Sequence, residues 1–183
     1  RIGAVGHSFG GTVALRFAVE YPERVSRLTL IEPVYFAALR EVDADAFAEN
    51  LASFEPMDAA IASGAFDQAA QMFNDRWSVV PWRHLPKAQK VYSRDRILFI
   101  PAQGVGISED SGELFSRGKV RHLSCPVRLI RGAKSPSVVE RIHKALMTYL
   151  PQATDHVVDG AGHMCPLTHA AEVAALIQQP TAQ

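Results

Sequence analysis

A short segment near the start of the chain combines a nucleophilic side chain with the glycines that a tight turn needs. Ser8 stands at the centre of Gly6-His7-Ser8-Phe9-Gly10, which matches the pattern G-x-S-x-G. An apolar run precedes it and a helical pattern follows it, so the turn is expected to hold the hydroxyl in a strained, exposed conformation. Side chains two residues before and two residues after Ser8 are expected to collide, which explains both glycines. The amide of Phe9 is a candidate donor to a developing oxyanion. We therefore predict that Ser8 is the nucleophile of an acyl-transfer reaction.

A serine hydroxyl needs a base within hydrogen-bond reach, and His163 is the strongest candidate among the seven histidines. His163 follows Asp159-Gly160-Ala161-Gly162, a flexible turn directly after the last expected strand. Its ring is expected over the carboxyl edge of the sheet, where catalytic groups gather in parallel α/β proteins. We expect the ring of His7 to point away from Ser8. The other histidines are expected on loops, on helix surfaces, at the start of the last strand or in the last helix: His84, His122, His143, His156 and His169.

The elements that must position Ser8 and His163 alternate between strands and helices at both ends of the chain. Residues 2–6 are expected to form a fully buried strand, and residues 25–31 a second strand parallel to it. Further strands are expected at 127–130 and 156–159, with a closing helix over 167–177. This pattern predicts an α/β fold with a parallel sheet.

The middle of the chain has a different character. Residues 36–99 are rich in alanine and helical in period, and four of them fall on one stripe: Phe66, Ala70, Phe73 and Trp77. Residues 101–119 carry four glycines and are expected to form a long loop. The sequence therefore predicts a helical insertion between two stretches of strand–helix units.

Taken together, these motifs resemble the α/β-hydrolase superfamily. Gly6 to Gly11 and Gly160 to His163 look like its nucleophile turn and histidine loop, and Cys125 to Gly132 resembles its penultimate strand. The resemblance implies a core at 1–35 and 120–183, and a helical cap with its connecting loop at 36–119. It also implies that the chain is the C-terminal portion of the fold, without the upstream strands and the second oxyanion donor. We therefore expect this segment alone to be inactive.

The acid that should orient His163 departs from the pattern of that superfamily. The usual carboxylate stands three residues after the glycine of the penultimate strand, where this chain has Ser135 in the turn into a helix. Glu32 is the leading alternative, because it directly follows a buried apolar strand, where an unpaired carboxylate is costly. Certain haloalkane dehalogenases resemble this arrangement. Asp159 and Asp110 remain open as alternatives, as does a surface role for Glu32.

Composition excludes several other classes of function. Nineteen basic residues balance nineteen acidic ones, which gives no electrostatic case for nucleic acid or an anionic membrane. No apolar run approaches the roughly 20 residues of a membrane span. Cys125 and Cys165 lie far apart, which argues against a disulfide framework, and we expect neither a metal nor a cofactor. Oligomeric state and compartment stay open.

Two hypotheses remain. The first is a serine hydrolase that acts on an ester, thioester or carbon–carbon bond of a small apolar substrate. Phe73, Trp77 and Trp82 are its candidate pocket walls. The second is a non-catalytic relative that kept the scaffold for ligand binding or interaction, and the serine at position 135 is its main support.

Overall fold

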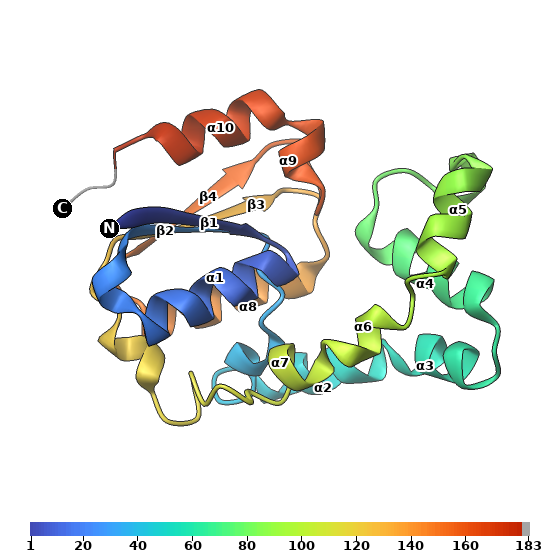
Figure 1. The fold of residues 1–183 in the computed structure, drawn as a ribbon, viewed down its shortest axis with the longest axis horizontal. Coiled ribbons are helices and arrows are strands. Elements are labelled where there is room, and N and C mark those ends of the chain that lie inside the picture. Colours follow the sequence, from blue (N-terminus) through green and yellow to red (C-terminus); the bar gives the residue numbers. More distant parts are fainter. Residues whose placement is uncertain (181–183) are drawn as a thin grey trace.

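The computed structural model describes residues 1–180, in which four parallel strands form one sheet in the order β1-β2-β3-β4 (Figure 1). The strands are β1 (Ile2–His7), β2 (Val25–Ile31), β3 (Val127–Gly132) and β4 (Ala153–Val158). Their register places all four carboxyl ends at the same edge. The predicted α/β fold with a parallel sheet is confirmed.

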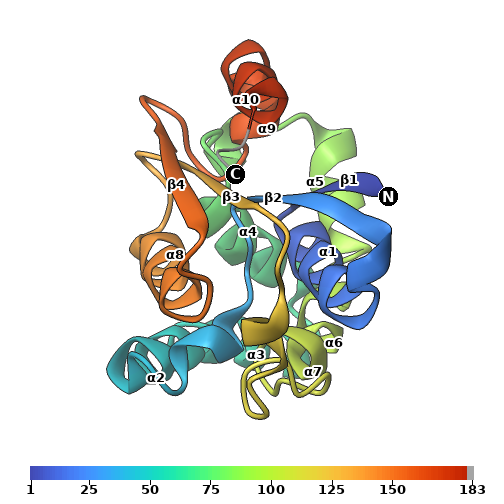
Figure 2. The same cartoon turned by 90° about the vertical axis from the view of Figure 1, so that its left-hand side faces the viewer.

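Helices cover both faces of this sheet (Figure 2). On one face lie α1 (Phe9–Glu20) and α8 (Ser137–Tyr149), and on the other lie α9 (Cys165–Thr168) and α10 (Ala170–Gln178). Because side chains alternate along a strand, Leu30 and Leu129 pack in the cluster with α1 and α8, whereas Ile31 and Ile130 pack in the cluster with α9 and α10. Apolar residues on both faces explain why β2 and β3 appear as continuous apolar runs in the sequence.

The first strand is less buried than its sequence suggested. Ile2 is 56% exposed and Val5 is 48% exposed, so the prediction of a fully buried strand at residues 2–6 is wrong. Within residues 1–180, β1 has a strand neighbour on one side only, β2. An apolar run in the sequence indicates that a segment tends to be buried, but it does not show which part of the protein covers that segment.

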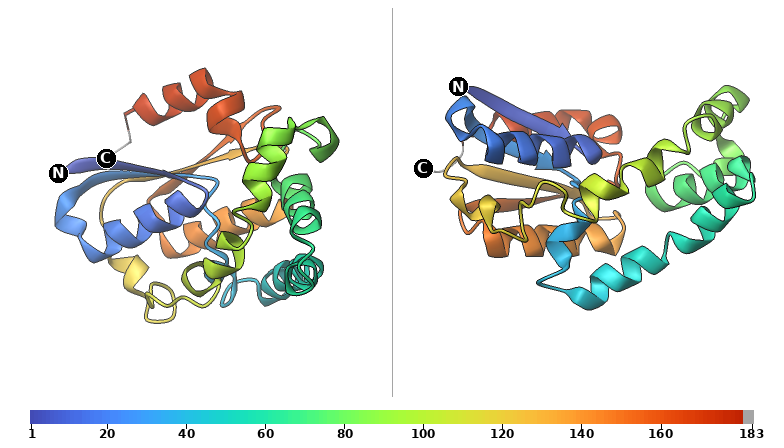
Figure 3. Two further views of the ribbon diagram at one scale, coloured as in Figure 1. Left: turned by 45° about the vertical axis from the view of Figure 1, so that its right-hand side comes forward. Right: turned by 60° about the horizontal axis from the view of Figure 1, so that its bottom comes forward.

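The predicted helical insertion stands at one end of the sheet (Figures 1 and 3). It contains α2 (Ala44–Ala52), α3 (Glu55–Ala62), α4 (Phe66–Trp77), α5 (Lys87–Arg94), α6 (Phe99–Ala102) and α7 (Gly104–Ile107). Short 3-10 turns occur at Pro22–Arg24, Phe36–Leu39, Trp82–His84 and Lys119–His122. The segment 101–119, expected to be a loop, is therefore partly helical at its start.

The insertion has a small apolar core of its own. Met57, Ala60, Ala69, Ala70 and Ile97 are buried against one another there. Phe54 and Phe73 pack against both this cluster and the large cluster of the sheet, so the insertion is joined to the core as a layer that faces the carboxyl edge of the strands.

Candidate active site

Ser8 sits in the turn between β1 and α1, and its backbone lies in a region that side chains rarely adopt. Its φ is 55° and its ψ is −125°, and its N–H donates to the carbonyl of Ile31 at 2.9 Å. A Cβ on Gly6 would lie 2.2 Å from the carbonyl oxygen of Gly10, so this position requires glycine. A Cβ on Gly10 would meet no atom within 4 Å, so the predicted collision is wrong there. The turn is asymmetric because only Gly6 faces the start of the helix.

Three side chains from distant parts of the chain form a continuous row of hydrogen bonds. The hydroxyl of Ser8 lies 3.0 Å from Nε2 of His163, and Nδ1 of His163 lies 3.0 Å from Oε2 of Glu32. His163 is 5% exposed and Glu32 is fully buried. With Glu32 ionised, Nδ1 carries the proton and Nε2 is free to accept the Ser8 proton. This arrangement can activate a hydroxyl for attack on a carbonyl.

Glu32 stands one residue beyond β2, with a φ of 50°. Besides His163, its carboxylate accepts hydrogen bonds from the N–H of Gly132 and the hydroxyl of Ser135, both at 2.6 Å to Oε1. Burial raises the pKa of Glu32, but the three hydrogen bonds outweigh burial, and the pKa lies below its ordinary value. Ser135, at the position where the resemblance placed an acid, therefore helps to hold the carboxylate of Glu32.

The loop that carries His163 is held against the end of β3. A Cβ on Gly132 would lie 2.4 Å from the carbonyl oxygen of Ala161, so the two backbones approach too closely for any side chain. The N–H of Lys134 donates to the same carbonyl at 2.7 Å. These contacts fix where the loop leaves the sheet and therefore where the imidazole of His163 lies.

His7 also holds this loop through its ring. Its Nε2–H donates to the backbone carbonyl of His163 at 2.8 Å, and the two ring centroids are 5.0 Å apart. Burial is the main reason that the pKa of His7 lies below its ordinary value. A neutral His7 beside His163 avoids placing two like charges next to each other.

The amide of Phe9 begins α1 next to the hydroxyl of Ser8. Within the described part of the chain, this N–H has no hydrogen-bond acceptor. The first amides of a helix have no partner inside the helix, and they favour negative charge. Phe9 is thus free to donate to an oxygen bound at Ser8.

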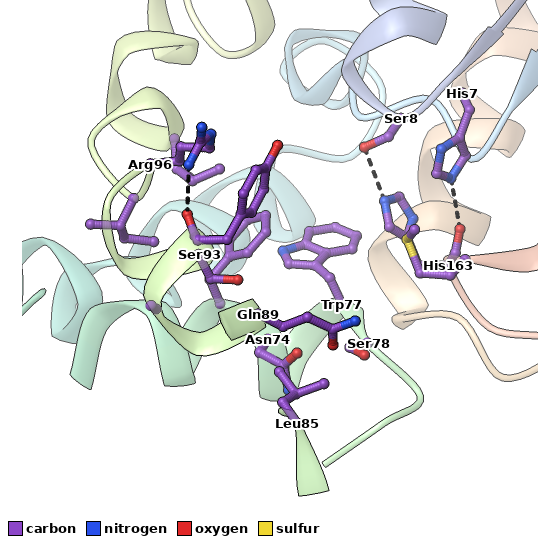
Figure 4. Close-up of a pocket in the computed structure, with 16 residues that line it drawn as sticks. His7, Ser8, Asn74, Trp77, Ser78, Leu85, Gln89, Ser93, Arg96 and His163 are labelled. Carbon is purple, nitrogen blue, oxygen red and sulfur yellow. Dashed lines mark hydrogen bonds between the residues drawn. The ribbon is translucent and has the colours of Figure 1, made fainter. Parts of the chain in front are cut away.

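A pocket of about 680 Å³ opens over Ser8 and His163, between the edge of the sheet and helices α4 and α5 (Figure 4). Phe73 and Trp77 line it, and the ring of Trp77 lies 4.6 Å from that of His163. Trp82 is not among the lining residues, so its prediction as a pocket wall is wrong. It lies in the short turn Trp82–His84, beyond the end of α4 at Trp77, and packs against the apolar core of the insertion.

Several pocket residues were not predicted from the sequence. They are the polar or aromatic residues of α4, α5 and the segments beside them: Asn74, Ser78, Gln89, Tyr92, Ser93 and Arg96. Asn74 shares the helical stripe of Ala70 and Trp77, so its spacing contained the signal. Gln89, Ser93 and Arg96 are spaced by four and three residues, as on one helix face.

Within residues 1–180, neither of the alternative acids, Asp110 and Asp159, forms a hydrogen bond or ion pair with His163, whose carboxylate partner is Glu32. Asp110 accepts hydrogen bonds from the hydroxyl of Tyr35 at 2.8 Å and from three backbone N–H groups, at Leu114, Phe115 and Ser116. Burial raises the pKa of Asp110, but these hydrogen bonds outweigh it and lower the pKa. Asp110 therefore braces the segment that returns from the insertion, and Asp159 is exposed.

His143 was expected on a helix surface, and that expectation is wrong. It is fully buried, and its Nδ1 lies 2.7 Å from Oδ1 of Asp155, which also pairs with Arg131. His143 lies one residue after Ile142 and three before Leu146, so it belongs to the apolar face of α8. The partly buried carboxylate of Asp155 on β4 gives a histidine on that face a partner.

Comparison with known proteins agrees with this geometry. The model of the Alpha/beta hydrolase family matches residues 1–176. The chain belongs to this family. Among curated proteins, it is 26% identical over 173 residues to 2-hydroxymuconate semialdehyde hydrolase of Pseudomonas sp. strain CF600, over 94% of this chain and 59% of that protein.

Solved structures of α/β hydrolases share the same fold. A thermophilic esterase from Thermogutta terrifontis, with malate bound, is 25% identical with a TM-score of 0.58, over 97% of this chain and 63% of that one. The enol-lactonase from Burkholderia xenovorans LB400 is 16% identical with a TM-score of 0.64, over 97% of this chain and 64% of that one. At this level of identity the likeness concerns the fold alone. The chain thus spans about 59–64% of the length of these three proteins. No helix in residues 1–180 is long and apolar enough to cross a membrane.

Proposed function

We propose that this α/β hydrolase is a serine hydrolase in which Ser8 is the nucleophile, His163 the general base and Glu32 the acid that orients His163. The observation that carries the proposal is the continuous row of hydrogen bonds from Ser8 to Glu32 at the floor of a pocket. A scaffold kept only for binding has no need of a buried carboxylate, an imidazole and a hydroxyl in this order.

In the proposed reaction, Oγ of Ser8 attacks the carbonyl carbon of the substrate while its proton passes to Nε2 of His163. The oxyanion that forms is stabilised by the N–H of Phe9. When the tetrahedral intermediate collapses, His163 gives its proton to the leaving group and an acyl-Ser8 ester remains. Water then attacks this ester and gives a proton to His163, and the acid product leaves as the Ser8 hydroxyl is restored.

The lining of the pocket suggests a general class of substrate and does not identify a single compound. Esters, thioesters and activated carbon–carbon bonds all pass through an acyl-Ser8 intermediate. Phe73, Trp77, Ile97 and Ile100 give the pocket an apolar middle, which suits a small substrate with an apolar body. We also propose that residues 36–119 act as a cap, because residues between Ala70 and Ile100 supply most of the pocket lining.

We propose further that the 183 residues alone turn substrate over poorly. Two N–H donors are expected around the oxyanion, and the described residues supply one of them, the amide of Phe9. The relatives compared above are longer than this chain, so we propose that the second donor lies outside these 183 residues. Losing one such donor costs about 10²–10³ in rate. The full-length protein is therefore the one to assay.

A fluorophosphonate probe tests the nucleophile directly, because it reacts with activated serines. The full-length protein should be labelled at Ser8, as mapped by peptide mass spectrometry, and the S8A variant should not be labelled. Ser78 and Ser93 remain in the pocket of S8A, so loss of the label there assigns the reaction to Ser8. Absence of labelling in the wild-type protein would favour the non-catalytic binding hypothesis.

A further inference from the structure

The pocket wall across from Ser8 carries a cation without an acidic partner. Arg96 lines the pocket, and Figure 4 shows its side chain on the opposite side from Ser8. Its guanidinium carbon lies 3.7 Å from the ring centroid of Tyr92, and Nη1 donates to the backbone carbonyl of Tyr92 at 3.3 Å. No carboxylate among residues 1–180 forms an ion pair with Arg96. The remaining N–H donors of this held guanidinium are therefore open to a ligand.

The other lining residues reinforce this imbalance of charge. The described lining contains no aspartate or glutamate, and its titratable side chains besides Arg96 are His7, Tyr92 and His163. Burial lowers the pKa of His7 and so favours its neutral form. A ligand that enters the pocket thus meets one fixed positive charge and no fixed negative charge.

The segment around Arg96 is also basic, although the chain as a whole is neutral. Residues 83–96, here called the basic segment, contain five basic residues and one acidic residue, a net charge of +4. Nineteen basic and nineteen acidic residues balance over the full sequence. A local positive field beside a pocket raises the concentration of anions at its mouth.

We propose, on the basis of the serine-hydrolase function above, that the substrate carries a free carboxylate at the end remote from the bond that is cleaved, and that Arg96 binds it. A guanidinium matches a carboxylate with two parallel hydrogen bonds, and one lining cation balances one negative charge. Phe73, Ile97 and Ile100 then contact the apolar middle of the substrate, and its carbonyl reaches Ser8. The substrate is an apolar acid with a second, reactive carbonyl group.

Binding to the full-length S8A variant tests this proposal without turnover. Isothermal titration calorimetry should give a dissociation constant for monomethyl adipate, which has a free carboxylate, about tenfold lower than for dimethyl adipate, in line with a charge-assisted hydrogen bond. Adding R96Q should remove most of this preference. R94Q is the matched control, because Arg94 pairs with Asp95 at 2.7 Å and does not line the pocket, and it should change the preference less than twofold.

Three results would overturn the carboxylate site. The first is the absence of a preference for monomethyl adipate, whether both esters bind equally or neither binds. The second is an equal loss of affinity for both esters in R96Q. The third is a loss of preference in R94Q as large as in R96Q. Since the first comparison needs no change at Arg96, it holds even if R96Q folds poorly. These results are independent of fluorophosphonate labelling at Ser8, so failure of the carboxylate site and failure of the hydrolase proposal are distinguishable.

Discussion

Replacing Glu32 with glutamine keeps the size of the side chain but removes its charge and one acceptor oxygen. The structure determines how the amide must sit. The N–H of Gly132 and the hydroxyl of Ser135 both donate to Oε1, and the backbone N–H cannot reverse its role. The amide oxygen of the variant therefore stays at the Oε1 position, and its NH₂ group faces Nδ1 of His163.

That orientation imposes the wrong tautomer on His163. Nδ1 must accept from the new NH₂ group, so the proton of the neutral ring moves to Nε2, which then cannot take the proton of Ser8. The variant also loses the negative charge that stabilises the imidazolium. The same kind of substitution in a serine protease costs about 10⁴ in kcat, so we expect E32Q to lose about 10³–10⁴, or roughly 4–5.5 kcal/mol of transition-state stabilisation.

The assay is steady-state hydrolysis of a p-nitrophenyl ester by the full-length protein, with S135A as the matched control. Ser135 supplies one of three hydrogen bonds to Glu32 and leaves its charge intact, so S135A should lose about tenfold or less. A thermal melt of each variant checks that the fold is intact. Equal, small losses of activity in E32Q and S135A would refute the role of Glu32. No other acid could then explain the activity, because Asp110 is hydrogen-bonded to Tyr35 and no other acid in the described chain contacts His163.

Two further predictions concern the turn and the buried acid. G6A should lose at least about 3 kcal/mol of unfolding free energy or fail to fold, because its Cβ would lie 2.2 Å from backbone. G10A should leave the unfolding free energy unchanged or raise it by up to about 1 kcal/mol, because its Cβ would meet no atom within 4 Å. Urea unfolding compares the two variants, and equal losses would contradict the asymmetric turn. The lowered pKa of Glu32 contributes stability above the ordinary glutamate value of about 4.3, and this contribution is lost as pH falls through the folded-state pKa. Urea midpoints between pH 6 and pH 3 should therefore fall less steeply in E32Q than in wild type, and parallel slopes would refute the assignment.

Local rules explain why much of the fold could be predicted from the sequence. The turn at Ser8 needs only a strand, a glycine and a helix that follow one another directly, so its signal is contained in a few residues. A charge directly after a buried apolar strand needs a partner, which indicates Glu32, and a glycine-rich loop after the last strand indicates His163. Parallel strands bring such positions to one edge without any knowledge of side-chain packing.

Tertiary packing explains what the sequence did not reveal. Trp82 and Phe73 are both aromatic residues of the insertion, yet only Phe73 lines the pocket, because helix packing decides which face turns inward. The contact of His7 with the histidine loop could not be predicted, because its partner, the carbonyl of His163, lies 156 residues away. Arg96 had the spacing of a helix face, but the sequence cannot show that this face has no acidic partner.

The position of the carboxylate shows how a parallel sheet lets one group replace another. Ile31 lies opposite Ile130 in the ladder, and the N–H of Glu32 donates to the carbonyl of Ile130 at 2.8 Å, so β2 and β3 end side by side. A side chain that follows either strand can therefore approach the same imidazole nitrogen. Here the hydroxyl of Ser135 lies 2.6 Å from Oε1 of Glu32, which places the two positions in direct contact. In the proposed mechanism His163 needs a charge at one point in space, and the ends of β2 and β3 both lie close enough to supply it.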